Sequence, residues 1–319
     1  STLDPSSAAS DVYKRQDIYF MNDFILLKMR WIGYTTQHIH HLLNVFPKFF
    51  NVNEHVQFEM INEWESLYLK KKRFTQLEEI SYDYIQTQLS RSQVNYVTSF
   101  SSQYPPLLKT IYDYPFILFY RGNIHLLSST YTLGVVGSRE ATHYSKCALD
   151  YLFPHFINIP LTIVSGLAKG ADSIAHQFAL KHHLPTIAVL GFGHLNHYPK
   201  ETRKLRNIIE ETGLVISEYP PLTKINKYQF PERNRLISGL SRGVLITEAK
   251  IKSGSQITID CALDQNRNVY VLPGSMFNPL TKGNLLRAQE GAMIVSEAED
   301  ILYDYCCLLY TSPSPRDRG

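Results

Sequence analysis

The sequence predicts an α/β protein, a parallel sheet with crossover helices, preceded by a small all-helical domain. From Thr132 onward, short apolar runs alternate with helical stretches at the spacing of right-handed βαβ units. Runs that end in a turn with glycine and a hydroxyl residue are typical of buried parallel strands that feed ligand-facing loops. Residues 24–89, in contrast, carry apolar residues at three- and four-residue spacing, the period of amphipathic helices.

Composition indicates an ordinary soluble globular protein. Of 319 residues, 44% are hydrophobic and 19% are charged, which disfavours disordered and fibrous classes. The formal net charge is only +3, so a nucleic-acid partner has to be met by a local patch. Four irregularly spaced cysteines favour neither a disulfide framework nor a zinc site and fit a reducing cytoplasm. Without a signal sequence or an apolar run near the roughly 20 residues that span a bilayer, we expect a cytoplasmic protein with no membrane insertion.

Periodicity divides the chain into segments. Both ends lack periodicity and are rich in Ser, Pro and isolated charges, so they are expected to be non-native or disordered. Pro47 and the polar NVNEH stretch separate short helices in the helical part. The expected segments are tails at 1–20 and 306–319, a helical domain at 21–89, a linker at 90–103 and an α/β domain at 104–305.

The α/β domain is expected to consist of alternating strands and helices. Apolar runs bounded by glycine, proline or polar residues mark the strands, and the longer amphipathic stretches between them mark the helices. The predicted strands are 116–120, 133–136, 161–164, 186–190, 214–217, 244–247 and 269–272. The predicted helices are 141–156, 171–182, 201–211, 233–240 and 256–265.

Two turns form the first candidate site. The run 133–136 ends at a Gly-Ser-Arg turn, and the run 161–164 ends at a turn that places a lysine inside a glycine-bounded loop. Because neighbouring parallel strands end at the same edge of a sheet, both turns are expected to face one crevice where helix N-termini attract an anion. In the alternative interpretation, the glycines only form the turns and the lysine is solvated. The candidate phosphate ligands are Gly137, Ser138, Arg139, Ser165, Gly166 and Lys169.

A basic loop with aromatic residues follows the fifth predicted strand. Between Tyr219 and Arg242, five basic residues stand against Glu232 alone, a local net charge of +4, and Tyr219, Tyr228 and Phe230 are interleaved with them. Cations that follow a backbone beside aromatic faces that stack bases are what single-stranded nucleic-acid binding requires. In the alternative interpretation, Phe230 belongs to the core and arginines brace the loop. The candidate contacts are Lys224, Lys227, Phe230, Arg233 and Arg235.

A further turn, Ser253-Gly254-Ser255, follows the sixth predicted strand and opens a helix, adding N–H donors at the same sheet edge. The sequence contains neither the dinucleotide fingerprint GxGxxG nor the P-loop GxxxxGK[ST], which disfavours a Walker-type ATPase. Glu218 and Glu248 do not form a convincing acid–base pair, and we find no nucleophile spaced with a base. We therefore expect no catalytic residue, no metal site and no cofactor.

With these motifs in order, the sequence closely resembles the DNA-processing protein A (DprA, also called Smf) family of bacterial natural-transformation factors. The blocks that carry the resemblance, between Tyr104 and Tyr303, are YPPLL, GSR, SGLAKGAD, YP, SEYP, FPERNRLISGLS, SGS and LPG. The resemblance implies an extended Rossmann-like domain, preceded by a helical domain like a sterile alpha motif (SAM) in position and pattern. It implies a DNA pocket formed by Arg139, Ser165, Gly166, Lys169 and the loop 224–235, which includes Asn234.

The expected function is that of a non-enzymatic recombination mediator that binds single-stranded DNA, protects incoming DNA and helps load the RecA recombinase in natural transformation. The resemblance implies a homodimer, and apolar residues late in the chain, Leu285, Leu286 and Met293, are candidates for its interface. The alternative is a Rossmann-like enzyme that binds or hydrolyses a nucleotide or nucleoside phosphate. A binding protein needs an open basic track with aromatic residues, whereas an enzyme needs a closed pocket with a convergent acid or base.

Overall fold

The computed structural model describes residues 21–311. The expected N-terminal tail and residues 312–319 of the expected C-terminal tail lie outside the described residues. Helix α12 (Glu299–Thr311) continues past residue 306, where that tail was expected to begin. None of the helices within residues 21–311 is long and apolar enough to cross a membrane.

The N-terminal part is helical, as its periodicity predicts. Polar residues stand at the positions where its helices begin: the hydroxyls of Thr35 and Ser81 and the amide oxygen of Asn53 accept backbone N–H bonds at 3.1–3.2 Å. Trp64, Ile61 and Tyr34 are buried in the core between the helices. The helices are residues 21–32, α2 (Thr36–Val45), α3 (Glu54–Tyr68), α4 (Phe74–Glu79) and α5 (Tyr82–Arg91).

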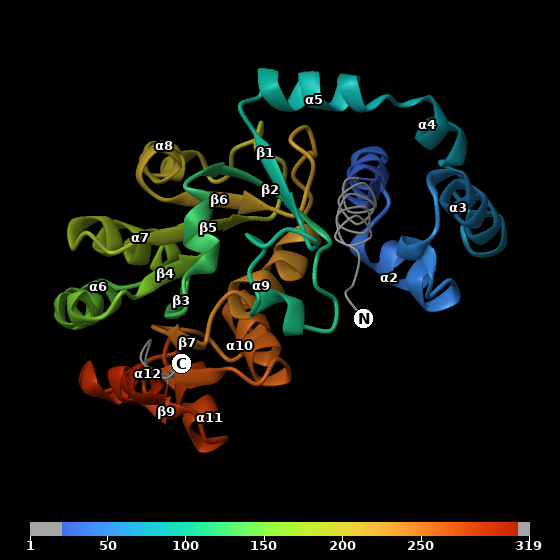
Figure 1. The fold of residues 1–319 in the computed structure, drawn as a ribbon. Helices are drawn as coiled ribbons and strands as arrows, with labels where there is room; N and C mark the ends of the chain where they lie inside the picture. The colour runs from blue at the N-terminus through green and yellow to red at the C-terminus, as the bar shows by residue number, and fades with distance from the viewer. Residues whose placement is uncertain (1–20, 312–319) are drawn as a thin grey trace, which may run out of the picture.

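The described chain forms one nine-stranded sheet, in the order β1-β2-β6-β5-β4-β3-β7-β8-β9 (Figure 1). From β6 to β9 the strands are parallel, whereas β1 pairs antiparallel with β2 and β2 with β6. The strands are β1 (Asn95–Thr98), β2 (Ile117–Gly122), β3 (Thr132–Val136), β4 (Thr162–Ser165), β5 (Thr186–Leu190), β6 (Leu214–Ser217), β7 (Gly243–Ile246), β8 (Asn268–Val271) and β9 (Met293–Ile294).

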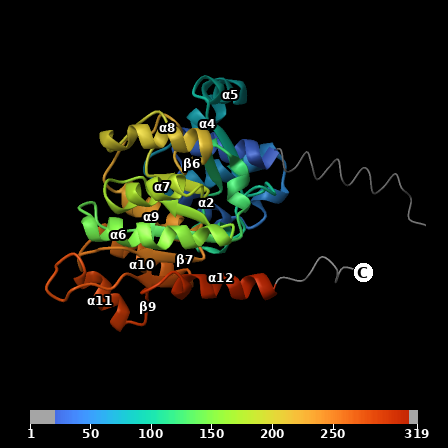
Figure 2. The ribbon, with the colours of Figure 1, turned by 90° about the vertical axis from the view of Figure 1, so that its left-hand side faces the viewer.

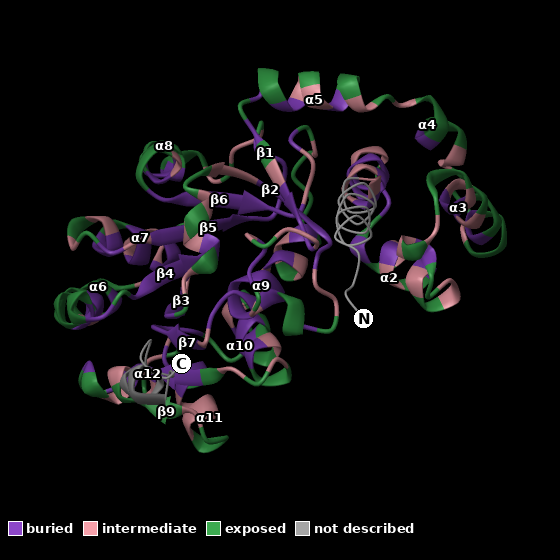
Figure 3. Cartoon of the chain, in the orientation of Figure 1, coloured by how far each residue is buried: buried purple, intermediate pink, exposed green. Residues whose placement is uncertain are grey.

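Helices cover both faces of the sheet, so its strands are buried on both sides (Figures 2 and 3). On β3, Leu133 and Val135 pack toward α6, α7 and α12, whereas Val136 packs toward α9 and α10, as the alternation of side chains along a strand requires. The predicted α/β class is confirmed. The remaining helices are α6 (His143–Leu152), α7 (Ala171–Lys181), α8 (Arg203–Thr212), α9 (Gln229–Gly239), α10 (Gly254–Asp264) and α11 (Lys282–Gln289).

The linker and the start of α9 also differ from the sequence expectation. The polar segment 90–103 contains strand β1, which pairs with β2 along its whole length, so part of the expected linker belongs to the sheet. Helix α9 begins at Gln229, four residues before the predicted start at Arg233. Pro231 lies in the first turn of α9, where a helix tolerates proline because the first N–H groups have no intrahelical partner.

The helical part rests on the antiparallel edge of the sheet. Phe116, which precedes β2, is buried in the core of the helical part, and Ile117 and Phe119 of β2 pack with Leu27 and Ile85. In Figure 1 the helical part lies beside β1 and β2, away from α6 and α7. Apolar burial therefore joins the helical part to the α/β domain.

Candidate nucleic-acid interface

The candidate site lies where the strand order reverses. After β3 the chain adds β4, β5 and β6 on one side, and then returns to add β7 and β8 on the other side of β3. The turns after β3 and β7 therefore diverge at the carboxyl ends of adjacent strands, which is the crevice that open α/β sheets use for ligands. Ser138 N–H donates to the Glu248 carbonyl at 2.6 Å, so the two turns are bonded to each other.

A cavity of about 630 Å³ occupies this crevice. Its lining combines the turn after β3, the N-terminal end of α10 and one side of α9. The Ser255 hydroxyl donates to the Gly137 carbonyl at 2.7 Å, which ties α10 to the first turn. Sequence-predicted residues in the lining are Gly137, Ser138, Arg139, Lys227, Phe230, Arg233, Asn234, Ser253, Gly254 and Ser255.

A second cavity, of about 400 Å³, adjoins the first. Arg139, Tyr198, Phe230 and Arg233 line both cavities. The second adds Gly166 and Lys169 from the turn after β4, and Lys200 and Glu201 from the segment before α8. The two predicted phosphate-binding turns thus line two adjoining cavities, which together form the hollow at the carboxyl edge of the sheet.

Arg233 is a fixed cation between the two cavities. Only 5% of the residue is exposed, and its Nη1 donates to the Val189 carbonyl at 2.9 Å. Within residues 21–311 its Nε has no hydrogen-bond partner. Burial lowers the pKa of Arg233, and the nearby carboxyl of Asp172 opposes that shift. A buried guanidinium with unused donors is suited to bind a phosphate oxygen.

Gly166 leaves the space that Arg233 occupies. A Cβ atom on Gly166 would lie 1.6 Å from Nη1 of Arg233, so only glycine permits this approach. The second candidate turn therefore needs its glycine to seat a cation from α9.

Aromatic rings separate the two cavities. The Arg139 guanidinium lies over the Phe230 ring at 5.8 Å from its centroid. Tyr198 lies 5.8 Å from Phe230, centroid to centroid, and Phe192 lies 6.3 Å from it on the core side. Phe230 is half-buried, so it packs on the core with one part and lines both cavities with another. Phe230 therefore packs on the core, as the alternative interpretation expects, and its contact with bases stays a prediction.

The hollow carries a surplus of positive charge. Among the residues that the structure describes, six cations line the two cavities, against the three carboxylates of Glu140, Asp172 and Glu201. Lys250 pairs with Glu140 at 3.3 Å on the surface. The cations are Arg139, Lys169, Lys200, Lys227, Arg233 and Lys250.

Three sequence-predicted residues lie apart from the cavities. Ser165 is fully buried and its hydroxyl donates to the Val135 carbonyl at 2.6 Å. Arg235 is buried and ion-paired with Asp113 and Glu218, which fits the alternative interpretation that it braces the loop. Lys224 is exposed.

Sequence reasoning missed Tyr198, Lys200 and Lys250 as cavity residues. Tyr198 was visible only as part of the short block YP, which Lys200 follows. Lys250 lies in the turn after β7, but only Ser253 to Ser255 of that turn were taken as candidates. Their place at the carboxyl edge of the sheet is the signal that would have found them.

The carboxylates near the crevice are engaged by the protein itself. Glu248 is fully buried and accepts hydrogen bonds from the N–H and hydroxyl of Thr142, both at 2.8 Å, and from the Ser145 hydroxyl at 2.6 Å. Burial raises the pKa of Asp172, although the charge of Arg233 opposes this shift. The Asp172 carboxylate accepts a long hydrogen bond of 3.4 Å from the Ala168 N–H. Glu248 therefore anchors the start of α6 and Asp172 braces the turn after β4.

Comparison with known proteins identifies relatives of this fold and site. The family model of the DNA recombination-mediator protein A matches residues 95–306. The DNA processing protein DprA of Bacillus subtilis is 42% identical over 208 residues, which are 65% of this chain and 70% of that protein.

Two solved structures are also similar. The DNA processing protein A of Streptococcus pneumoniae matches with a TM-score of 0.76 and 34% identity over 86% of this chain and 95% of that one. The DNA processing protein A of Helicobacter pylori, whose structure is described as showing a unique single-stranded DNA binding mode, matches with a TM-score of 0.60 and 28% identity over 68% of this chain and 98% of that one. Because the family model matches residues 95–306, the chain belongs to the DNA recombination-mediator protein A family.

Proposed function

We propose that this protein binds single-stranded DNA in the hollow at the carboxyl edge of its sheet and acts as a recombination mediator. The observation that carries the proposal is the pairing of surplus cations with the aromatic side chains of Phe230 and Tyr198 in two adjoining cavities. Cations neutralise backbone phosphates, and exposed ring faces stack bases without regard to sequence. The single-stranded DNA binding described for the relative from Helicobacter pylori supports the same assignment.

Each group in the hollow has a role in this proposal. Arg139 and Arg233, which line both cavities beside Phe230, bind phosphate, while Lys169 and Lys227 extend the positive track into one cavity each. The α10 N-terminus, at Ser253 to Ser255, adds backbone N–H donors. Two cavities that share one aromatic wall suit consecutive nucleotides of a strand.

The test is a salt-resolved titration of single-stranded against double-stranded DNA, run beside a nucleotide hydrolysis assay. The proposal expects tight binding of single strands, weaker binding of duplexes and steep loss of affinity with salt. Equal competition by duplex DNA, or turnover of a nucleotide that Asp172→Asn abolishes, contradicts it and favours the nucleotide-enzyme alternative.

We also propose that the protein forms a homodimer and delivers single-stranded DNA to the RecA recombinase. The late segment supports a dimer because Phe277, Met293 and Ile294 are exposed by 87%, 49% and 52%, and β9 is a sheet edge. Sedimentation showing only monomer at tens of micromolar, about the range of transient affinities, contradicts the dimer. RecA filament growth on DNA coated with single-strand-binding protein should be faster with this protein than without it.

A further inference from the structure

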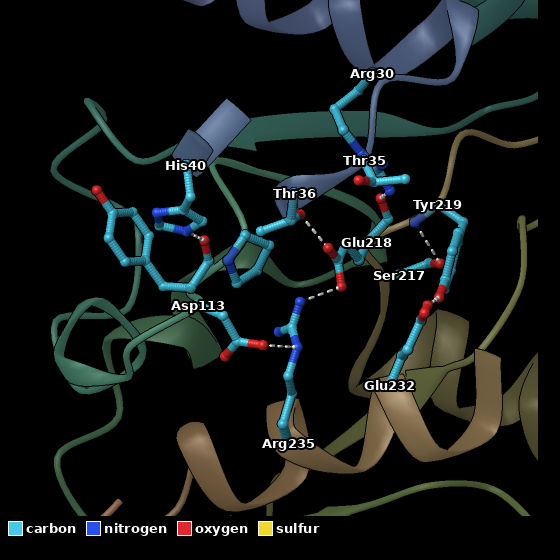
Figure 4. Close-up of polar contacts among 12 residues, drawn as sticks. Arg30, Thr35, Thr36, His40, Asp113, Ser217, Glu218, Tyr219, Glu232 and Arg235 are labelled. Carbon is cyan, nitrogen blue, oxygen red and sulfur yellow. Dashed lines mark hydrogen bonds and ion pairs between the residues drawn. The ribbon is translucent and has the colours of Figure 1, made fainter. Parts of the chain in front are cut away.

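A buried cluster of polar side chains joins the helical part to α9 (Figure 4). Arg30 and Thr36 come from the helical part, and Glu218 and Tyr219 follow β6. Arg235 of α9 completes its centre. Asp113, which precedes β2, and Glu232 of α9 extend the cluster at its two ends.

Glu218 is the hub of this cluster. Its backbone carbonyl accepts a bond from Arg30 Nη2 at 2.7 Å, and its carboxylate accepts one from the Thr36 hydroxyl. The other carboxylate oxygen accepts a hydrogen bond from Nη2 of Arg235 at 2.8 Å. Nε of Arg235 lies 2.9 Å from Oδ2 of Asp113. Glu218 thus connects two helices of the helical part, residues 21–32 and α2, to α9.

A second link runs in parallel. The Tyr219 hydroxyl donates to the Glu232 carboxylate at 2.5 Å, and the Arg30 guanidinium lies over the Tyr219 ring at 5.7 Å from its centroid. Helix α9 is therefore held at two points one turn apart, Glu232 and Arg235, and Arg30 contacts the partner of each.

Burial makes the cluster depend on all of its members. Arg30, Glu218 and Arg235 are 5%, 4% and 7% exposed, and its buried charges are balanced by Asp113. Burial acts to raise the pKa of Glu218, but Arg235, Arg30 and Thr36 outweigh burial, so the pKa lies below its usual value. Removal of one partner leaves the others buried without compensation.

The cluster and the DNA site lie on opposite faces of α9. At 100° per residue, Glu232 and Arg235 project on one side of the helix, and Phe230, Arg233 and Asn234 project about 180° away. The contacts agree, because the first pair bonds to the cluster and the other three line the larger cavity. A rotation or shift of α9 that released the cluster would move Phe230 and Arg233 in the hollow.

We propose that the helical part positions α9 through Arg30 and Thr36, and so holds Phe230 and Arg233 in the geometry that binds single-stranded DNA. The inference rests on the function proposed above. Apolar contacts already join the helical part to β2, whereas this polar cluster adds a fixed register between the helical part and α9. Arg30 and Thr36 are thus positioning residues that do not touch DNA.

The test compares Arg30→Met and the milder Thr36→Val with the matched control Arg121→Met. Arg121 of β2 also joins the helical part to the α/β domain, since it donates to the Ser92 carbonyl at 2.6 Å and pairs with Glu210 at 3.2 Å. Ser92 follows α5 and Glu210 lies in α8, so Arg121 has no partner on α9 among these contacts. Binding of fluorescent oligo-dT is measured at several salt concentrations, well below each melting temperature. Hydrogen exchange of residues 229–239 is measured in the same variants.

If α9 keeps its binding position only about a tenth of the time, affinity falls about tenfold. We expect that loss for Arg30→Met, a smaller loss for Thr36→Val, faster exchange in α9 for both, and an unchanged salt slope because no phosphate contact is removed. Arg121→Met should bind as the parent chain does. If Arg30→Met does not fold, the oligo-dT affinity and α9 hydrogen exchange of Thr36→Val and Tyr219→Phe test the inference instead.

Equal loss of affinity in Arg30→Met and Arg121→Met would mean that the cluster only stabilises the fold, and it would overturn the inference. If Arg30→Met is unfolded, unchanged binding of oligo-dT by Thr36→Val and Tyr219→Phe would also overturn the inference. A parent chain that does not bind oligo-dT refutes the proposed function instead, and α9 exchange then still reports whether the cluster fixes the helix.

Discussion

Replacement of Arg139 by alanine tests the phosphate track most directly. Arg139 is exposed, lines both cavities and lies over Phe230, so under the proposed function its loss should remove one phosphate contact without opening the core. A hydrogen bond to a charged group is worth about 1.5–3 kcal/mol, which is the expected loss of binding free energy at low salt.

The salt dependence gives a second magnitude. With six cations lining the hollow, the slope of log affinity against log salt has an upper limit of about 4, at roughly 0.7 per phosphate neutralised. Between 0.1 and 0.3 M salt, that limit corresponds to about a 100-fold loss of affinity. Arg139→Ala should lower the slope by about 0.7, so the variant loses roughly twofold less over the same interval.

Fluorescence anisotropy with oligo-dT measures both quantities, and Lys181→Ala is the matched control. Lys181 lies at the far end of α7 and pairs with Asp150 at 2.6 Å, so its removal changes the net charge equally. The control should retain the parent slope and affinity. Equal slopes for Arg139→Ala and the parent chain, or equal changes in both variants, would refute the assignment of Arg139 to a phosphate.

Three further predictions follow from other contacts. Phe230→Ala should cost about 1–3 kcal/mol of binding with little change in salt slope, because it removes stacking and not charge; a large drop in melting temperature would make Phe230 mainly a core residue. Gly166→Ala should displace the guanidinium of Arg233 and weaken binding by about 1–3 kcal/mol, and a crystal structure with Arg233 unmoved would contradict this. His176 is buried beside Thr186, and burial followed by the charge of Arg233 lowers its pKa to about 3. The unfolded chain binds that proton below about pH 6.5, so stability falls as pH drops, by about 1.4 kcal/mol from this group at pH 5.5. Urea unfolding at pH 7.5 and 5.5 should show a smaller difference for His176→Asn than for the parent chain, and an equal difference would disprove the assignment.

Local sequence signals were sufficient for most of the sheet. Each apolar run predicted as a strand is one, because strands buried on both faces need continuous apolar residues. The turns after β3, β4 and β7 were placed at one edge by the rule for parallel strands. Strand β1 was missed because its four residues, NYVT, show no alternating apolar pattern and lie in a polar segment.

The individual roles of the basic residues depended on tertiary contacts. Arg233 and Arg235 are two residues apart in the same motif, yet one lines the cavities and the other bonds to Glu218. That difference comes from the helical phase of α9, whose start was predicted four residues late, and from partners distant in sequence. Ser165 was expected in the turn, but it is the last residue of β4 and points into the core.

The reversal of strand order sets when the binding hollow can exist during synthesis. Strands β3 and β7 are neighbours although roughly 100 residues separate them, and closing a loop of that length costs about 4 kcal/mol in chain entropy. A ribosome that has released β3 to α9 has produced Arg139, Lys169 and Phe230 but not the wall from Ser253 to Ser255. The nascent chain therefore completes the lining of the larger cavity only once β7 and α10 have emerged.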